Sequence, residues 1–140
     1  AELSANPPAR ARLIQLSVAG AFHTVHMQPA VAELAELADG LTTAAPNTRL
    51  LSNADGSIVD DGAEVLRRLV SQVGNPVRWD LCLAALAELG VTGILELPPS
   101  GTLTGIAKRN LKGVALFNLN TPDQLADARA FVAEHAGVTA

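Results

Sequence analysis

Hydrophobic and polar residues alternate in two different periods along the first third of the chain. Residues 11–19 repeat with a period of two over a run rich in aliphatic residues, which is typical of a strand. The segment 27–41 is rich in Ala, Leu and Glu, and its apolar residues fall at helical spacing. Pro29 fits only the first turn of such a helix. The sequence therefore begins with a predicted strand followed by a predicted helix.

The rest of the chain repeats this alternation. Further strands are predicted at 49–53, 91–97 and 114–119, and further helices at 61–74, 80–89, 102–112 and 121–135. Asp61 and Thr121 are each followed three residues later by Glu or Gln, a pattern that begins helices. Gly90 and Gly113 directly follow predicted helices, where glycine ends them. Strands that alternate with helices indicate an α/β fold with a mainly parallel sheet.

Composition and charge narrow the class of protein. The 140 residues are 49% hydrophobic, enough for one domain or part of one, and the net charge of -4 argues against a nucleic-acid-binding face. No apolar run reaches the roughly 18 residues of a membrane span, and we identify no signal peptide. The single cysteine, Cys82, cannot form an internal disulfide and fits a cytoplasmic location. Because the first residue is Ala1 rather than Met, we expect a processed chain or a fragment.

His23 is the first candidate for chemistry. It directly follows the first predicted strand, and in open α/β sheets reactions take place beyond the carboxyl ends of strands. Histidine is also the side chain that most readily takes up and returns a proton near neutral pH. Position alone fits a histidine that caps or packs at least as well, and that is the more frequent case.

Five segments give a more specific indication. They are GAFHTVHM (20–27), LLSNADG (50–56), QVGNPVRWDL (72–81), ELPPSGTLTGIAKR (96–109) and TPDQL (121–125). In this order the segments resemble blocks of bacterial malonyl-CoA:acyl-carrier-protein transacylases, most closely the actinobacterial type. The resemblance covers the C-terminal half of that family. It implies that 1–19 ends a small ferredoxin-like subdomain and that 20–140 is the C-terminal part of an α/β-hydrolase-like acyltransferase domain.

The resemblance also implies a reaction and roles for three residues. In the family a serine attacks the malonyl thioester, a histidine takes the serine proton, and the phosphopantetheine thiol of acyl carrier protein then takes the acyl group. By resemblance His23 is that histidine, and a carbonyl of Gln72 orients it in place of a carboxylate. Phe22 goes with malonyl substrates, because its ring leaves no room for a 2-methyl branch. The alternatives are a solvated helix-end residue for Gln72 and a plain core residue for Phe22.

The serine itself is not in this sequence, because no G-x-S-x-G motif surrounds any of its serines. In the family that serine lies upstream, together with the arginine that pairs with the malonate carboxylate and part of the oxyanion hole. We therefore expect a missing N-terminal half to be a partner, and the 140 residues alone to be inactive. Two alternatives stay open: a non-catalytic α/β scaffold or binding module, and an acyltransferase domain of a polyketide synthase.

Basic residues and loops suggest further contacts. Lys108, Arg109 and Lys112 close a predicted helix, where they either complement the helix dipole or dock the acidic acyl carrier protein. The loop PPSGT (98–102) precedes the same helix and could offer N–H groups to the phosphates of the CoA thioester. We expect no cofactor. We also expect no metal site, since His23 and His26 have too few further ligands nearby.

Overall fold

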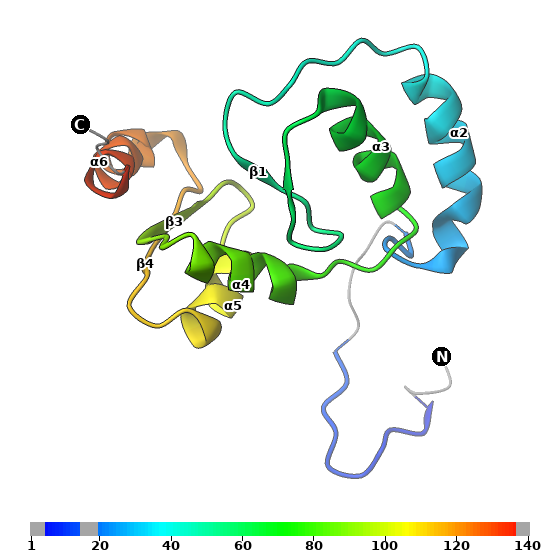
Figure 1. Cartoon of the computed structure of the whole chain (residues 1–140). Helices are drawn as coiled ribbons and strands as arrows, with labels where there is room; N and C mark the ends of the chain where they lie inside the picture. The colour runs from blue at the N-terminus through cyan, green and yellow to red at the C-terminus, as the bar shows by residue number, and fades with distance from the viewer. Residues whose placement is uncertain (1–4, 15–19, 137–140) are drawn as a thin grey trace.

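The computed structural model describes residues 5–14 and 20–136 (Figure 1). Its helices are α2 (Gln28–Ala38), α3 (Gly62–Gln72), α4 (Trp79–Glu88), α5 (Thr102–Asn110) and α6 (Leu125–His135), with short 3₁₀ turns η1 (Val25–Met27) and η2 (Pro122–Gln124). Its strands are β1 (Leu50–Leu51), β2 (Ile58–Val59), β3 (Gly93–Glu96) and β4 (Ala115–Asn118). The predicted helices are confirmed to within a few residues of their expected ends.

The helix ends follow from local side-chain chemistry. The N–H of Glu64 donates to Asp61 Oδ1 at 2.7 Å, so Asp61 caps α3 as predicted. Thr121 and Gln124 form a reciprocal capping box, and η2 then continues into α6. Gly90 and Gly113 have φ of 67° and 82°, a left-handed backbone that glycine adopts without cost. These residues explain why the sequence pattern located the helices well.

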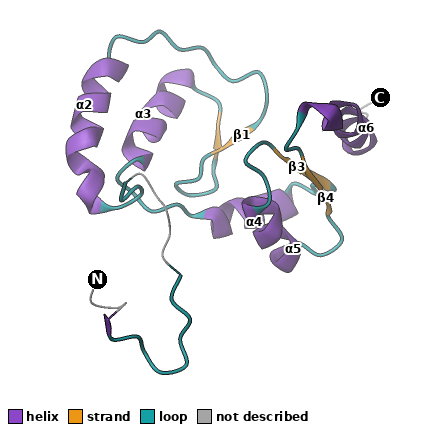
Figure 2. Cartoon of the chain, turned by 180° about the vertical axis from the view of Figure 1, so that it is seen from behind, coloured by secondary structure: helices purple, strands orange, loops and turns teal. Residues whose placement is uncertain are grey.

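Helices α2 and α3 lie side by side in the first half of the fold (Figure 1, Figure 2). Next to them β1 and β2 pair antiparallel, with Leu50 opposite Val59. The turn between the two strands is closed by N–H donation from Ser52 to Ser57 O at 2.8 Å. The predicted strand 49–53 is thus present, shortened to two residues.

The second half of the fold is a β-α-β unit followed by a helix. Strands β3 and β4 are parallel, with Gly93 opposite Ala115 and Glu96 opposite Asn118. Helices α5 and α6 lie on opposite sides of this pair in both views (Figure 1, Figure 2). The expected α/β alternation is therefore confirmed over this half.

Two expectations need correction. Residues 11–14, part of the predicted strand 11–19, lie in a loop, and residues 15–19 are outside the described part of the chain. In place of one mainly parallel sheet, the described residues form two separate pairs of strands, one antiparallel and one parallel. The periodicity of a segment shows which of its faces is apolar, whereas strand pairing depends on other segments. The sheet was therefore predicted less well than the helices.

Few large side chains are fully enclosed. The buried apolar residues are Val59, Val70, Cys82, Leu83, Ala107 and Ala128. Leu37 and Val25 are 73% and 71% exposed, although they lie on or beside α2, and Ile14 and Leu97 are similarly open. The described residues thus leave many large apolar side chains in contact with water. None of their helices is long and apolar enough to cross a membrane.

Candidate active site

The end of α3 holds His23 by two hydrogen bonds. The ring nitrogen Nδ1 of His23 lies 2.9 Å from the main-chain oxygen of Gln72, the last residue of the helix. The main-chain N–H of His23 donates to the oxygen of Val73, also at 2.9 Å. Two consecutive carbonyls therefore fix both the backbone and the ring of one exposed histidine. The structure brings together the two residues that the resemblance pairs as catalytic.

The partner of the ring defines its tautomer. A carbonyl oxygen only accepts hydrogen bonds, so Nδ1 of His23 must carry the proton in this contact. In the neutral ring Nε2 is then the unprotonated nitrogen and can accept a proton from another group. The arrangement can therefore support general-base chemistry at Nε2.

The backbone of His23 is itself unusual. Its φ is 62°, in the left-handed region that few residues other than glycine adopt. Histidine enters this region more readily than most residues, and the hydrogen bond to Val73 stabilises it there. Thr24 then caps the following turn, since its hydroxyl accepts from His26 N–H at 3.3 Å. No pattern in the sequence predicts this backbone conformation.

Phe22 lies next to the histidine with its ring tilted. The two ring centroids are 6.4 Å apart and the planes meet at 56°. The Phe22 ring also approaches Gly20, where an added Cβ would lie 3.2 Å from it. Phe22 is 51% exposed, so the described residues do not enclose it as a core side chain. Its position fits a ring beside a reacting group, and its role in specificity remains a prediction.

Glu96, the last residue of β3, was not among the predicted site residues, and its side chain reaches the N-terminus of α5. The residue is 8% exposed, and its carboxylate accepts from three N–H groups and one hydroxyl. The donors are Gly101 N at 2.9 Å, Leu103 N at 3.0 Å, Thr104 N at 2.8 Å and Thr104 Oγ1 at 2.7 Å. Burial raises the pKa of Glu96, but these hydrogen bonds outweigh it and bring the pKa down to about 2.

This carboxylate overturns the phosphate-binding expectation for PPSGT (98–102). The N–H of Ser100 donates to Asn120 Oδ1 at 3.2 Å, and those of Gly101, Leu103 and Thr104 donate to Glu96. These groups are therefore already used and would face a negative charge, which repels phosphate. A charged residue at the end of an otherwise apolar strand was the available signal for this contact.

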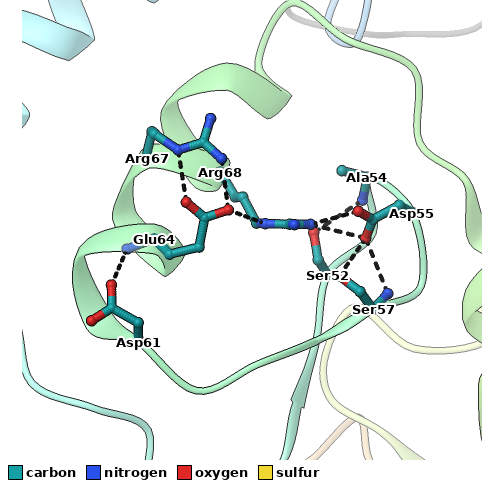
Figure 3. A network of polar contacts seen from close by, with 8 residues as sticks. All are labelled: Ser52, Ala54, Asp55, Ser57, Asp61, Glu64, Arg67 and Arg68. Carbon is teal, nitrogen blue, oxygen red and sulfur yellow. Dashed lines mark hydrogen bonds and ion pairs between the residues drawn. The ribbon is translucent and has the colours of Figure 1, made fainter.

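A second polar network ties the β1–β2 turn to α3 (Figure 3). Arg68 Nη1 lies 2.9 Å from both oxygens of Asp55, and Arg68 Nε lies 2.6 Å from Glu64 Oε1. Hydrogen bonds from Ser57, followed by those from Arg68, lower the pKa of Asp55 to about 2. Hydrogen bonds from Arg67 and Arg68 lower the pKa of Glu64 to about 2 as well. The network fixes the same helix whose last residue holds His23.

In the described part of the chain, the other candidate site residues make no hydrogen bond to His23 or Gln72. Lys108 and Arg109 are in the last turn of α5, and Lys112 follows it; all three are exposed. A cavity of about 300 Å³ lies against α3, but its lining residues, which run from Leu50 to Leu69, include neither His23 nor Gln72. Within residues 5–14 and 20–136, no three side chains of the kinds that bind metal ions form a cluster.

Comparison with known proteins adds to this geometry. No family model matches the chain. The malonyl CoA-acyl carrier protein transacylase of Mycobacterium tuberculosis (strain ATCC 25618 / H37Rv) is 51% identical over 124 residues, which are 89% of this chain and 41% of that protein. The crystal structure of MCAT from Mycobacterium tuberculosis superposes with a TM-score of 0.79 at 50% identity, over 90% of this chain and 42% of that one.

A third match is a complex. The structure titled "PlMCAT:AntF (holo)", a type II PKS acyl-carrier protein with its malonyl-transacylase, matches at 31% identity and a TM-score of 0.74, over 81% of this chain and 37% of that one. These matches place the chain in the transacylase class. It belongs to the family of malonyl-CoA:acyl carrier protein transacylases, and it spans about two fifths of the length of the curated relatives that it matches.

Proposed function

We propose that these residues are the histidine-bearing part of an enzyme that transfers a malonyl group from malonyl-CoA to the phosphopantetheine thiol of acyl carrier protein. The observation that carries the proposal is the 2.9 Å contact between His23 Nδ1 and Gln72 O. It leaves Nε2 of His23 free to act as a base in a chain that is 51% identical to a malonyl CoA-acyl carrier protein transacylase. In this proposal His23 is the general base and Gln72 the group that orients it.

The proposed chemistry has two halves. His23 Nε2 takes the proton of a serine hydroxyl while the serine oxygen attacks the malonyl thioester carbon. The C–S bond breaks, the imidazolium returns the proton to the CoA thiolate, and a malonyl-serine ester remains. The phosphopantetheine thiol then gives its proton to His23 and attacks the ester. The C–O bond breaks, the serine regains its proton, and the malonyl group leaves on the carrier protein.

The nucleophilic serine lies outside these 140 residues in this account. Residues 20–140 are then the C-terminal part of the large α/β domain, and residues 1–19 end the small ferredoxin-like subdomain. The exposed apolar side chains on α2, such as Leu37 at 73%, are consistent with further protein covering that surface. The proposed setting is the cytoplasm, where both acyl donors and carrier proteins of fatty-acid and polyketide synthesis would be available.

Lys108, Arg109 and Lys112 are the proposed docking surface for the carrier protein. All three are exposed at the end of α5, away from the helix N-terminus that Glu96 neutralises. Exposed cations can attract an acidic partner and speed its association. These cations also interact favourably with the negative end of the α5 dipole, so a role in docking must be separated from a role in helix stability.

The direct test is a transfer assay with the full-length protein that carries these residues. The protein is mixed with malonyl-CoA and holo acyl carrier protein, and the carrier is weighed by mass spectrometry. We expect one malonyl group on the carrier protein in the presence of enzyme, and much slower transfer when His23→Ala replaces the wild type at the same concentration. A wild-type protein that folds yet transfers nothing would favour the alternative of a non-catalytic scaffold.

A further inference from the structure

Gln72 contributes a side chain to the site as well as a carbonyl. The residue is 6% exposed, and its Nε2 donates to the main-chain oxygens of Asn75 at 2.8 Å and Pro76 at 2.9 Å. These two residues belong to the turn that follows α3 and leads to α4. The amide thus joins the last residue of α3 to the turn beyond it.

The turn offers the Gln72 amide nitrogen as many acceptors as it has hydrogens. A primary amide nitrogen has two hydrogens, and here each has one carbonyl acceptor on consecutive residues. Two bonds from one planar group fix the path of the turn relative to the last residues of α3. That path matters because the carbonyls of Gln72 and Val73 are the two groups that hold His23.

The other restraints on this turn lie at its surface. Asn75 N–H donates to Gln72 O at 3.3 Å, and Asn75 Nδ2 donates to Ser71 O at 2.7 Å and to Ser71 Oγ at 3.1 Å, but Asn75 is exposed. Gly74 allows Gln28 of α2 to approach closely, which brings the helix that follows His23 against the same turn. Among these restraints, the hydrogen bonds of the Gln72 amide are therefore the ones made by a buried residue.

We infer that the side-chain amide of Gln72 is a positioning group for the general base: it holds the end of α3 so that the Gln72 carbonyl keeps the proton of His23 on Nδ1. This inference rests on the proposed function, in which His23 is the base. Without the amide, the turn and the carbonyl can rotate, and the ring loses the partner that selects its tautomer. The backbone carbonyl is present in every variant, so the side chain can be tested by itself.

The test is Gln72→Met in the full-length protein, because methionine keeps the length of the side chain and removes both donors. We expect kcat for malonyl transfer to fall roughly 10- to 100-fold, since a small misplacement of a catalytic group has an effect of this size. The KM for malonyl-CoA should change less than about twofold, because Gln72 is not placed on the substrate. ¹⁵N NMR of the three histidines should show His23 shifting from the Nδ1–H form toward the Nε2–H form.

The matched control is Ser71→Ala, one residue earlier. It removes the hydroxyl that accepts from Asn75 Nδ2 at 3.1 Å and leaves both Gln72 bonds intact, so activity and tautomer should stay at wild-type values. If Gln72→Met fails to fold, Gln72→Asn takes its place, since its donor is retained one methylene short of the turn. Either variant with unchanged kcat and an unchanged His23 tautomer overturns the inference.

The two proposals can fail separately. If wild-type enzyme transfers no malonyl group, the proposed function is wrong, whatever the tautomer of His23. A second outcome is that wild-type enzyme is active and the Gln72 variants lose kcat/KM only through a higher KM for malonyl-CoA, with the His23 tautomer unchanged. The side chain would then act on substrate binding, and the positioning role would be contradicted.

Discussion

His23 Nδ1 and the main-chain oxygen of Gln72 are 2.9 Å apart, although the two residues are 49 positions apart in the sequence. The contact joins the GAFH segment to the end of α3. It gives an exposed histidine a fixed tautomer without a carboxylate partner. The remaining polar network, from Asp55 through Arg68 to Glu64, stabilises the same helix nearer its N-terminus (Figure 3). Stability and site geometry are therefore linked through α3.

Gly56 should tolerate alanine less well than Gly90. Both glycines have positive φ, 75° and 67°, so alanine strains the backbone at either site. An added Cβ at Gly56 would also lie 2.7 Å from the main chain of Leu81, whereas Gly90 has no heavy atom within 4 Å. We expect about 1 kcal/mol of destabilisation for Gly90→Ala and about 2–4 kcal/mol for Gly56→Ala. Denaturant unfolding measures both, and equal losses would contradict the close contact with α4.

Acid should weaken the fold through its depressed carboxylates. The pKa of Asp55, Glu64 and Glu96 is about 2 for each, below the ordinary range near 4. A depressed pKa contributes stability that is present above the ordinary pKa and is lost as pH falls toward 2. The thermal midpoint should therefore drop steeply between about pH 5 and pH 2.

The substitution Arg68→Met tests whether the ion pairs of Asp55 and Glu64 contribute to this pH dependence. Without the guanidinium, the pKa of Asp55 and of Glu64 should rise part of the way toward ordinary values, because the hydrogen bonds from Ser57 and Arg67 remain. The variant should therefore be less stable at pH 7 and lose less stability on acidification. Arg49→Met, at an exposed position before β1, is the control and should keep the wild-type slope. Identical slopes for wild type and Arg68→Met would show that the network does not stabilise the fold.

Phe22→Ser should relax selectivity in the full-length enzyme. The ring lies beside His23, and its removal would leave room for a 2-methyl branch on the acyl group. A methyl group in such a pocket is worth about 1–3 kcal/mol, so the methylmalonyl-to-malonyl ratio of kcat/KM should rise about 10-fold or more. Leu37→Ser, on the exposed face of α2, controls for the loss of apolar surface. An unchanged ratio would contradict the steric role of Phe22.

Charge reversal should separate docking from helix stability. The double variant Lys108→Glu, Arg109→Glu should raise the KM for acyl carrier protein by about tenfold at low salt and leave the KM for malonyl-CoA unchanged. The double variant Arg49→Glu, Arg129→Glu alters charge equally at two other exposed positions. If both doubles raise the KM for the carrier alike, net charge is responsible and the end of α5 is not a docking surface.

Local chemistry made much of this fold predictable. The Asp61 cap, the Thr121 capping box and Gly90 all act within a few residues of their own position, so the sequence pattern located α3, α4 and α6. The pairing of strands was less predictable, because β1 and β2 are only two residues long and β3 pairs with β4 across the whole of α5. Of the expected strand at 11–19, residues 11–14 lie in a loop, and residues 15–19 are outside the described part of the chain.

The site, like the fold, was only partly predictable from local sequence. The roles suggested for His23, Gln72 and Phe22 came from resemblance, because no spacing in the sequence links positions 23 and 72. Glu96 was read only as part of an apolar strand, since the donors that bind it converge from a turn and a helix start. The left-handed backbone of His23 likewise depends on a hydrogen bond to a distant residue.

The most direct test of the central claim is the rate at which the full-length protein becomes acylated by malonyl-CoA, followed by intact mass spectrometry for wild type and His23→Ala. We expect that wild type gains one malonyl group per chain. We also expect His23→Ala to gain it about 100- to 10,000-fold more slowly, the usual contribution of a general base. Equal rates of acylation would show that His23 does not activate the nucleophile.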